Sequence, residues 1–160
     1  MLLLFDATFS PITAMLMEIA VKYGCLLVAD AHQNMLEGIR TLLAELFEVV
    51  VMVADEDSLL GTLVTVNPDL IIVDLSLPPS GAERILRRLR LSDLSSPAKV
   101  IILSVHDEAE VVQEAIDAGA MGFVLKRSAA TDMIPAVEAV LKGITYISPG
   151  VQTTLRSQST

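Results

Sequence analysis

The sequence predicts an open α/β fold in which helices cover both faces of a parallel sheet. Short runs rich in Val, Ile and Leu alternate with helical segments between residues 25 and 143. Strands that are apolar almost throughout are typical of a sheet covered on both faces. Regular alternation of strands and helices favours parallel pairing with right-handed crossovers. The chain has 160 residues, enough for one domain with extensions.

Each predicted element has a local signal. Apolar β-branched runs predict strands at residues 25–30, 49–53, 70–75, 100–104 and 122–125. Helices are expected at residues 34–46, 57–66, 82–91, 107–118 and 129–141. Asp57 is the expected cap of the second helix, and Gly119 and Gly143 end the last two. The prolines and glycine of residues 78–81 predict a turn before the third helix.

The two ends of the chain are expected to lie outside this body. Residues 1–24 form an N-terminal extension that is predicted to be helical, because Ser10 can cap a helix, Pro11 suits its first turn and Gly24 can end it. An alternative is that translation starts later, at Met15 or Met17. Residues 144–160 are expected to be a C-terminal linker.

Composition excludes several classes of protein. Hydrophobic residues make up 52% of the chain and charged residues 19%, which is incompatible with a disordered chain. The net charge of −9 argues against direct nucleic-acid binding by this segment, because phosphate contacts need clustered Lys and Arg. The single cysteine, Cys25, excludes an internal disulfide and is expected to be a buried structural thiol.

Nothing in the sequence predicts a membrane segment. No stretch reaches the roughly 18 apolar residues that suggest a membrane span. The first basic residue is Lys22, so the basic start of a secretory signal is missing. We therefore expect a cytoplasmic protein with no membrane contact.

Polar residues stand at the ends of four predicted strands: Asp30, Asp74, Ser104 and Lys126. Ligands of open α/β sheets bind at the carboxyl ends of the strands, so these side chains are expected to meet. Around a phosphoryl group, one carboxylate can act as nucleophile and another can help to hold Mg²⁺. The hydroxyl and the ammonium can bind the phosphoryl oxygens. Taken singly, each residue has a simpler interpretation as a cap, a turn former or a solvated side chain.

Over residues 25–150 the chain resembles the receiver domain of bacterial two-component response regulators, in particular the LuxR-type (NarL/FixJ) branch. The matching segments are LVADAHQ at 27–33, EGIR at 37–40, PDLIIVDLSLP at 68–78, VIILSVHD at 100–107, AGAMGFVLK at 118–126 and YISP at 146–149. The resemblance implies a flavodoxin-like, doubly wound parallel sheet of five strands in the order 2-1-3-4-5.

The resemblance also implies roles in phosphoryl transfer. Asp74 would accept a phosphoryl group from a histidine kinase or a phosphotransfer protein. Asp30 and Asp74 would hold Mg²⁺, together with the backbone carbonyl of Ser76. Beyond autocatalytic phosphoryl transfer and autodephosphorylation, no enzyme activity is expected.

A second set of implied roles concerns switching. Ser104 would be the hydroxyl that moves onto the phosphoryl group, and Lys126 would pair with that group. Phe123 would be the aromatic side chain that turns inward when Ser104 moves. The usual responding face is the fourth helix, fifth strand and fifth helix, which could also support a homodimer, as could the first and fifth helices.

Three departures from the family pattern are visible. Ala31 replaces the second of two consecutive acids, normally the direct metal ligand, so Mg²⁺ binding should be weakened. Arg127 stands where many relatives have proline, and the turn after Asp74 is one residue shorter than the common form. These departures leave open a weak but working receiver, a degenerate pseudo-receiver that binds proteins without phosphorylation, and a receiver switched by another ligand.

Other interpretations are less well supported. LuxR-type regulators continue into a helix-turn-helix domain, so residues 144–160 would be a linker or the start of that missing domain, and any transcriptional role would belong to a longer parent protein. A hydrolase triad is disfavoured because no Gly-x-Ser-x-Gly elbow is present. Zinc ligation by His32 and His106 is not expected, since the family often has histidine at both positions. An unrelated flavodoxin-like binding protein or enzyme remains the third hypothesis.

Overall fold

Parallel pairing of six strands organises the fold, in the order β2-β1-β3-β4-β5-β6. The computed structural model describes residues 11–12, 22–91 and 98–151. Within these residues the strands are β1 (Tyr23–Ala29), β2 (Phe47–Val53), β3 (Leu70–Asp74), β4 (Lys99–Ser104), β5 (Gly122–Leu125) and β6 (Tyr146–Ile147). The helices are α2 (Gln33–Leu43), α3 (Glu56–Val66), α4 (Ala82–Leu91), α5 (Ala109–Asp117), the short 3₁₀ helix η2 (Lys126–Ser128) and α6 (Ala129–Leu141).

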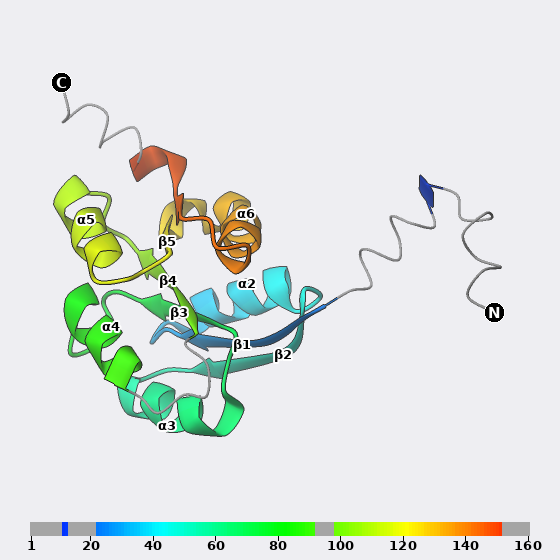
Figure 1. Cartoon of the computed structure of the whole chain (residues 1–160), viewed down its shortest axis with the longest axis horizontal. Helices are drawn as coiled ribbons and strands as arrows, with labels where there is room; N and C mark the ends of the chain where they lie inside the picture. The colour runs from blue at the N-terminus through cyan, green and yellow to red at the C-terminus, as the bar shows by residue number, and fades with distance from the viewer. Residues whose placement is uncertain (1–10, 13–21, 92–97, 152–160) are drawn as a thin grey trace.

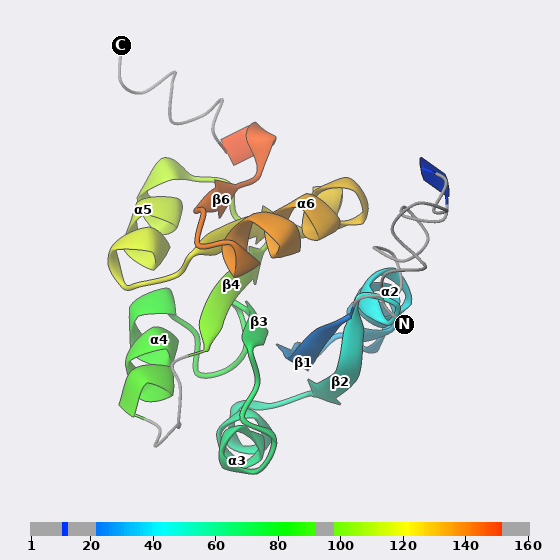
Figure 2. The same cartoon turned by 45° about the vertical axis from the view of Figure 1, so that its right-hand side comes forward.

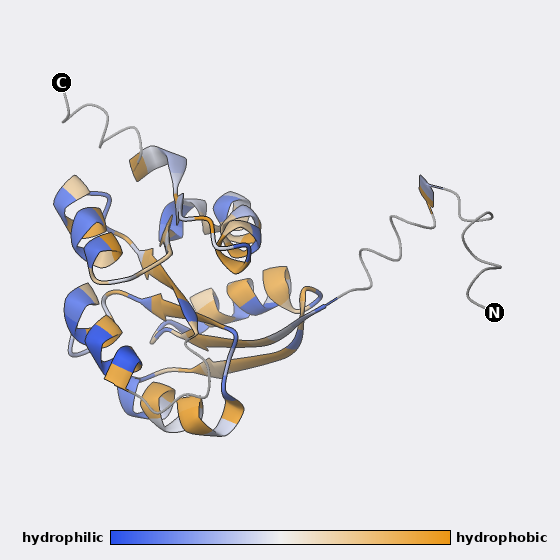
Figure 3. Cartoon of the chain, in the orientation of Figure 1, coloured by the Kyte–Doolittle hydropathy of each residue, from blue (hydrophilic) through white to orange (hydrophobic). Residues whose placement is uncertain are grey.

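Two layers of helices enclose the sheet, as Figure 1 shows. The buried side chains of α3, α4 and α5 share one apolar cluster with Leu27 and Ile71, whereas those of α2 and α6 share another with Leu26 and Ile72. Neighbouring strand residues therefore point to opposite faces, as the period of two requires. In Figure 3 the strands are mostly apolar and the helices carry both polar and apolar residues, which agrees with the predicted doubly wound α/β class.

The predicted count of five strands is wrong, because a sixth strand lies in the segment expected to be linker. Tyr146 and Ile147 of β6 pair in parallel with Gly122 and Phe123 of β5 (Figure 2). A strand of two residues carries no periodic signal, so only its docking on β5 reveals it. The order of the other five strands is as expected. The predicted N-terminal helix lies almost entirely outside the described residues.

Element boundaries differ from the predicted ones by a few residues. Asp55 rather than Asp57 caps α3, and its carboxylate accepts a hydrogen bond of 2.7 Å from the backbone N–H of Ser58. The same hydrogen bond lowers the pKa of Asp55 below its ordinary value. Acids at both positions make the cap ambiguous in sequence, and only the chain path decides which one reaches the free N–H groups.

An ion-pair cluster joins α3 to the arginine-rich helix α4. Glu56 is buried, and its carboxylate binds the guanidinium of Arg84 through both oxygens and that of Arg88 at 3.3 Å. Bidentate pairing of this kind is among the stronger charge-assisted interactions in proteins. Two of the four arginines of α4 therefore join this helix to α3.

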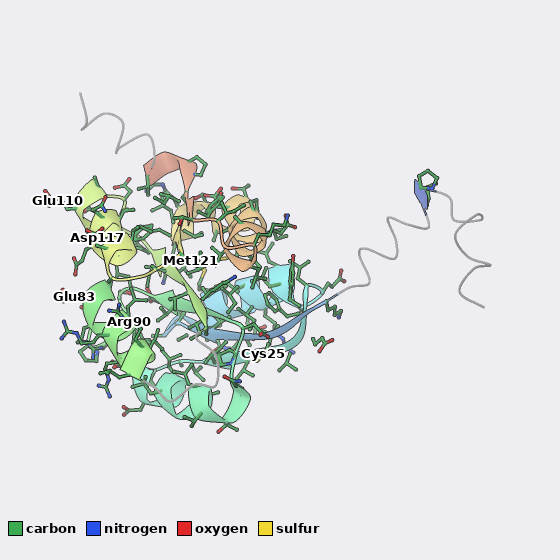
Figure 4. The ribbon with its side chains drawn as sticks, viewed as in Figure 1. Cys25, Glu83, Arg90, Glu110, Asp117 and Met121 are labelled. Carbon is green, nitrogen blue, oxygen red and sulfur yellow. The ribbon has the colours of Figure 1, made fainter. Side chains whose placement is uncertain are left out.

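Figure 4 shows Glu83 and Arg90 on α4 beside Asp117 of α5.

A buried hydrogen-bond network fixes β6 to the rest of the fold. The hydroxyl of Ser148 accepts from the backbone N–H of Leu125 at 3.0 Å and donates to Asp132 at 2.8 Å. Ser128 also donates to Asp132. Burial and the nearby charge of Asp132 raise the pKa of Tyr146. Because Leu125 directly precedes Lys126, this network sets the position of the end of β5.

None of the described helices is long and apolar enough to cross a membrane.

Packing around β5 gives a test of this fold. A Cβ added at Gly122 would lie 2.8 Å from Ile101 and 3.1 Å from Val140, so Gly122→Ala should destabilise the domain by about 1–3 kcal/mol. Gly38 is exposed on α2 with open space around it, so Gly38→Ala should stabilise by about 0.5–1 kcal/mol. Urea unfolding of both variants measures these changes. Equal effects of the two substitutions would contradict the packing described.

Candidate functional site

The strand register brings the four predicted residues to one edge of the sheet. Ala29 pairs with Val73 and Asp74 with Leu103, so Asp30 follows β1 beside Asp74 at the end of β3. Ser104 ends β4 opposite Leu125, and Lys126 comes next in the chain. The sequence-based expectation that these side chains meet rested on parallel strands ending at one edge, and the geometry follows that logic.

The centre of the site is an ammonium between two buried carboxylates. The Nζ of Lys126 lies 2.9 Å from Oδ2 of Asp30 and 3.1 Å from Oδ2 of Asp74. Asp30 is fully buried, Asp74 is 2% exposed and the Lys126 side chain is 9% exposed. Buried charges of one sign are costly unless an opposite charge is close, so the three groups depend on one another.

Ser76 holds the Asp74 carboxylate through contacts that sequence reasoning missed. Its backbone N–H donates to Oδ1 of Asp74 at 3.0 Å, and its hydroxyl lies 2.9 Å from both carboxylate oxygens. A hydroxyl has one proton and can donate to only one oxygen at a time. The sequence interpretation assigned only a backbone carbonyl to Ser76. The available signal was a hydroxyl residue two positions after a buried acid, a spacing typical of turn hydrogen bonds.

Ser104 and Phe123 lie on the strands β4 and β5 beside the site. None of the described hydrogen bonds joins Ser104 to Asp74. The hydroxyl of Ser104 is buried and accepts from the backbone N–H of His106 at 2.9 Å. Phe123 of β5 is fully buried in the apolar cluster shared with α3, α4 and α5. The loop after β4 is tied to the segment after β5, because Arg127 pairs with Asp107 at 3.0 Å.

His32 is the second residue that the structure adds to the site. Its ring Nδ1 lies 2.9 Å from Oδ1 of Asp30 and 3.8 Å from Oδ2 of Asp74. Its backbone N–H also donates to Oδ1 of Asp30, at 2.8 Å. The sequence interpretation discounted both histidines as metal ligands. Only His32 reaches the acids, because the chain turns sharply between β1 and α2, whereas His106 lies beside Glu108.

Two hollows flank the site. One of about 630 Å³ is lined by residues 31–35 with Val105 and Lys126. The other, of about 400 Å³, lies between the turn after β3 and α5, and Ser76 and His106 line it. Asp30 and Asp74 line neither hollow, but Lys126 lines the first and Ser76 the second, so each hollow adjoins a residue that contacts Asp74.

The donor set fits a divalent cation, with one ligand fewer than the resemblance implies. Asp30 and Asp74 offer hard oxygen ligands, but the ammonium of Lys126 already lies 2.9 Å from Oδ2 of Asp30 and 3.1 Å from Oδ2 of Asp74. Ala31 contributes only a methyl group. Two carboxylates are therefore available to a divalent cation, provided that the ammonium of Lys126 makes room for it.

Cys25 plays no part in this site. Burial and the neighbouring carboxylate of Asp69 raise the pKa of its thiol, so it stays protonated at neutral pH. Its backbone N–H donates to Asp69 at 2.8 Å. The prediction of a buried thiol is only partly met, because Cys25 is half-buried.

Comparison with known sequences agrees with the geometry. A family model described as the response regulator receiver domain matches residues 26–138. The transcriptional regulatory protein DegU of Brevibacillus brevis is 34% identical over 130 residues, covering 79% of this chain and 53% of DegU. The oxygen regulatory protein NreC of Staphylococcus haemolyticus is 30% identical over 132 residues, covering 81% of this chain and 60% of NreC. The chain thus spans between half and two thirds of these relatives.

Solved structures show the same fold. A two-component response regulator of the LuxR family from Aurantimonas sp. SI85-9A1 matches with a TM-score of 0.76 and 28% identity, over 84% of this chain and 96% of that one. The isolated receiver (REC) domain of RcsB from Salmonella enterica serovar Typhimurium, with the phosphomimetic BeF3⁻, matches with a TM-score of 0.71 and 27% identity. The match covers 81% of this chain and 96% of that one. RcsB bound to the promoter P1flhDC matches with a TM-score of 0.74 and 26% identity, over 84% of this chain and 67% of that one.

Three observations indicate the same family: the two acids and the lysine at the carboxyl ends of the strands, the family match over most of the chain, and the LuxR-type neighbours. The chain belongs to the response regulator receiver domain family of two-component systems, and its relatives are LuxR-type regulators.

Proposed function

We propose that this domain accepts a phosphoryl group on Asp74 from a histidine kinase or a phosphotransfer protein, and thereby switches a protein-interaction face. The observation that carries the proposal is the buried Asp74 carboxylate beside the ammonium of Lys126, at the carboxyl end of β3. A carboxylate placed in this way is a nucleophile with a counter-charge already aligned for the incoming phosphoryl oxygens.

The transfer step needs no further protein group to form bonds. A carboxylate oxygen of Asp74 attacks phosphorus, and the bond between phosphorus and the donor atom breaks with its electron pair going to the leaving group. The product is an acyl phosphate on Asp74. Lys126 is positioned to balance the added negative charge, while Ser76 must release at least one carboxylate oxygen, because its hydroxyl contacts both.

The switch would begin at Ser104. Its hydroxyl is held by the N–H of His106, and a phosphoryl oxygen on Asp74 offers a stronger, charged acceptor for the hydroxyl proton. Movement of Ser104 would shift the loop between β4 and α5. Phe123 is already buried, the orientation that the resemblance associates with the switched state. The responding face would then be formed by α5, β5 and α6. The acidic residues of α5 would lie in this face.

A divalent cation would be held by Asp30, Asp74 and the backbone carbonyl of Ser76. When bound, Mg²⁺ would draw in the phosphoryl oxygens and neutralise their charge. With Ala31 in place of an acid, we expect the affinity for Mg²⁺ to be weak.

A second candidate function is a pseudo-receiver that binds proteins without phosphorylation. Two observations favour it. Ala31 offers no ligand to a metal, and the ammonium of Lys126 pairs with Asp30 in the place that a cation would need.

A cytoplasmic location and a homodimer remain part of either proposal. We also keep the prediction that this segment alone does not bind DNA; RcsB, whose complex with a promoter is known, is matched over only 67% of its length.

Phosphorylation can be tested by intact-mass measurement after incubation with acetyl phosphate and Mg²⁺. The wild-type chain should gain one phosphoryl adduct, and Asp74→Asn should gain none because the nucleophile is lost. Asp117→Asn, which removes an acid of α5 away from the sheet edge, should keep the adduct. If the wild-type chain gains no adduct and beryllofluoride leaves its NMR spectrum unchanged, the pseudo-receiver is the better account.

Restoring the missing acid should strengthen Mg²⁺ binding. Ala31→Asp adds a carboxylate beside Asp30, and we expect a gain in affinity of about tenfold or more, since even indirect partners of metal ligands change affinity about 10–100-fold. Calorimetric titration with Mg²⁺ measures the change. The control Ala44→Asp adds the same charge at the exposed end of α2 and should change little. Equal affinities for Ala31→Asp and the wild type would show that position 31 does not face the metal pocket.

A further inference from the structure

Glu56 is a buried carboxylate that takes no part in the proposed phosphoryl transfer. Its side chain is 6% exposed, and both of its oxygens accept hydrogen bonds from the guanidinium of Arg84. Arg88 adds a contact of 3.3 Å. Because a buried carboxylate is costly without its partner, this pairing holds the side chain of Arg84 in one place.

The same guanidinium also binds the turn that follows the acceptor strand β3, residues 75–81, here called the acceptor turn. Nε of Arg84 donates to the backbone carbonyl of Pro79 at 3.0 Å, and Nη2 donates to the same oxygen. A guanidinium has five N–H donors in a planar fork, so one side chain can bind a carboxylate and a carbonyl together. Arg84 therefore joins the start of α3 to the acceptor turn.

Little else holds the far half of the acceptor turn. Leu77 is buried, but residues 78–80 are exposed. Pro78 and Pro79 have no N–H group to donate. Among the described residues, Arg84 is the only side chain from beyond residues 74–81 with a hydrogen bond to the backbone of this turn. The position of Pro79 thus depends on Arg84 more than on packing.

The near half of the acceptor turn is bonded to Asp74. The backbone N–H of Ser76 donates to the Asp74 carboxylate at 3.0 Å, and the N–H of Leu77 donates to the Asp74 carbonyl at 3.1 Å. Each of the two prolines that follow has its φ angle fixed near −65° by its ring. A stiff link of this kind passes a shift of Pro79 on to Leu77 and Ser76, so the contacts of Asp74 depend on the far half of the turn.

We propose that Arg84, held by Glu56, is a positioning residue for Asp74, because its hydrogen bonds to Pro79 keep the acceptor turn in the conformation that sets Ser76 against the carboxylate. Its consequence for phosphoryl transfer rests on the proposed function, whereas the position of the turn can be measured with no phosphodonor present. Two features that the transfer step leaves unused then have a role: the arginine-rich helix α4 and the short turn after Asp74.

Hydrogen exchange of the whole chain, followed by NMR, tests the position of the turn. Arg84→Met removes the donor to Pro79, so the N–H groups of Ser76 and Leu77 should exchange at least about tenfold faster as the turn opens locally. The N–H of Ile72, at the fully buried centre of β3, reports global unfolding and corrects for any loss of overall stability.

The matched control is Arg87→Met on the same helix. Arg87 pairs with Glu83 at 2.7 Å, and both side chains are exposed. Exposed pairs of this kind contribute little, so exchange in the acceptor turn should stay within about twofold of the wild type.

The double variant Glu56→Met/Arg84→Met separates the position of the turn from stability. Replacing both partners of a buried ion pair by apolar side chains is often neutral, so the midpoint of urea unfolding should recover relative to Arg84→Met. The carbonyl of Pro79 would still lack its donor, so Ser76 and Leu77 should exchange as fast as in the single variant. Recovery of both quantities would show that only the unpaired charge of Glu56 mattered, and would overturn the proposal.

The initial rate of adduct formation from acetyl phosphate and Mg²⁺ measures the consequence for transfer. Both Arg84 variants should gain the Asp74 adduct about tenfold or more slowly than the wild type, because small displacements of positioning groups have large effects on rate. A wild-type chain that gains no adduct would refute the proposed function, while the exchange measurements would still decide whether Arg84 positions the turn.

Two further results would overturn the proposal. One is exchange of Ser76 and Leu77 in Arg84→Met at the wild-type rate, or no faster than in Arg87→Met. The other is adduct formation in Arg84→Met at the rate of a wild-type chain that does gain the adduct.

Discussion

The ammonium of Lys126 between the carboxylates of Asp30 and Asp74 is the interaction on which the site depends. Both acids are buried, and they stand at adjacent strand ends because of the parallel register of β1 and β3. Without a cation they would repel each other in a medium that screens poorly. The lysine therefore lowers the cost of burying both acids side by side. A cation bound by both carboxylates would have to displace this ammonium, which contacts both of them.

The rest of the fold fixes where this lysine stands. Leu125 donates to Ser148 of the segment after β6, and Ser148 and Ser128 both donate to Asp132 of α6. Arg127 adds a tie to Asp107 in the loop after β4, next to Ser104. Residues on both sides of Lys126 are thus anchored to α6, to the segment after β6 and to the loop after β4. A change in charge at Asp74 would be felt first by these neighbours, which is how a local event at one edge of a sheet can reach a surface.

Much of this could be predicted from the sequence, and the misses have physical causes. Asp30, Asp74, Ser104 and Lys126 were located because parallel strands end at one edge. The hydroxyl contacts of Ser76 and the ring position of His32 were missed because they depend on side-chain rotamers in turns, which have no periodic pattern. The strand β6 is too short to show in the pattern and forms only by pairing with β5. The cap at Asp55 depends on the chain path between β2 and α3, where an alternative acid lies two residues away.

The measurement that tests the central claim most directly is the free energy of unfolding of Lys126→Met, obtained by denaturant titration. If the ammonium is what allows two buried carboxylates at this edge, its removal should destabilise the domain by about 3–5 kcal/mol. Adding Asp30→Asn to Lys126→Met should then restore a large part of that loss, whereas Lys142→Met, at an exposed lysine after α6, should be nearly neutral. A Lys126→Met variant within about 0.5 kcal/mol of the wild type would contradict the account.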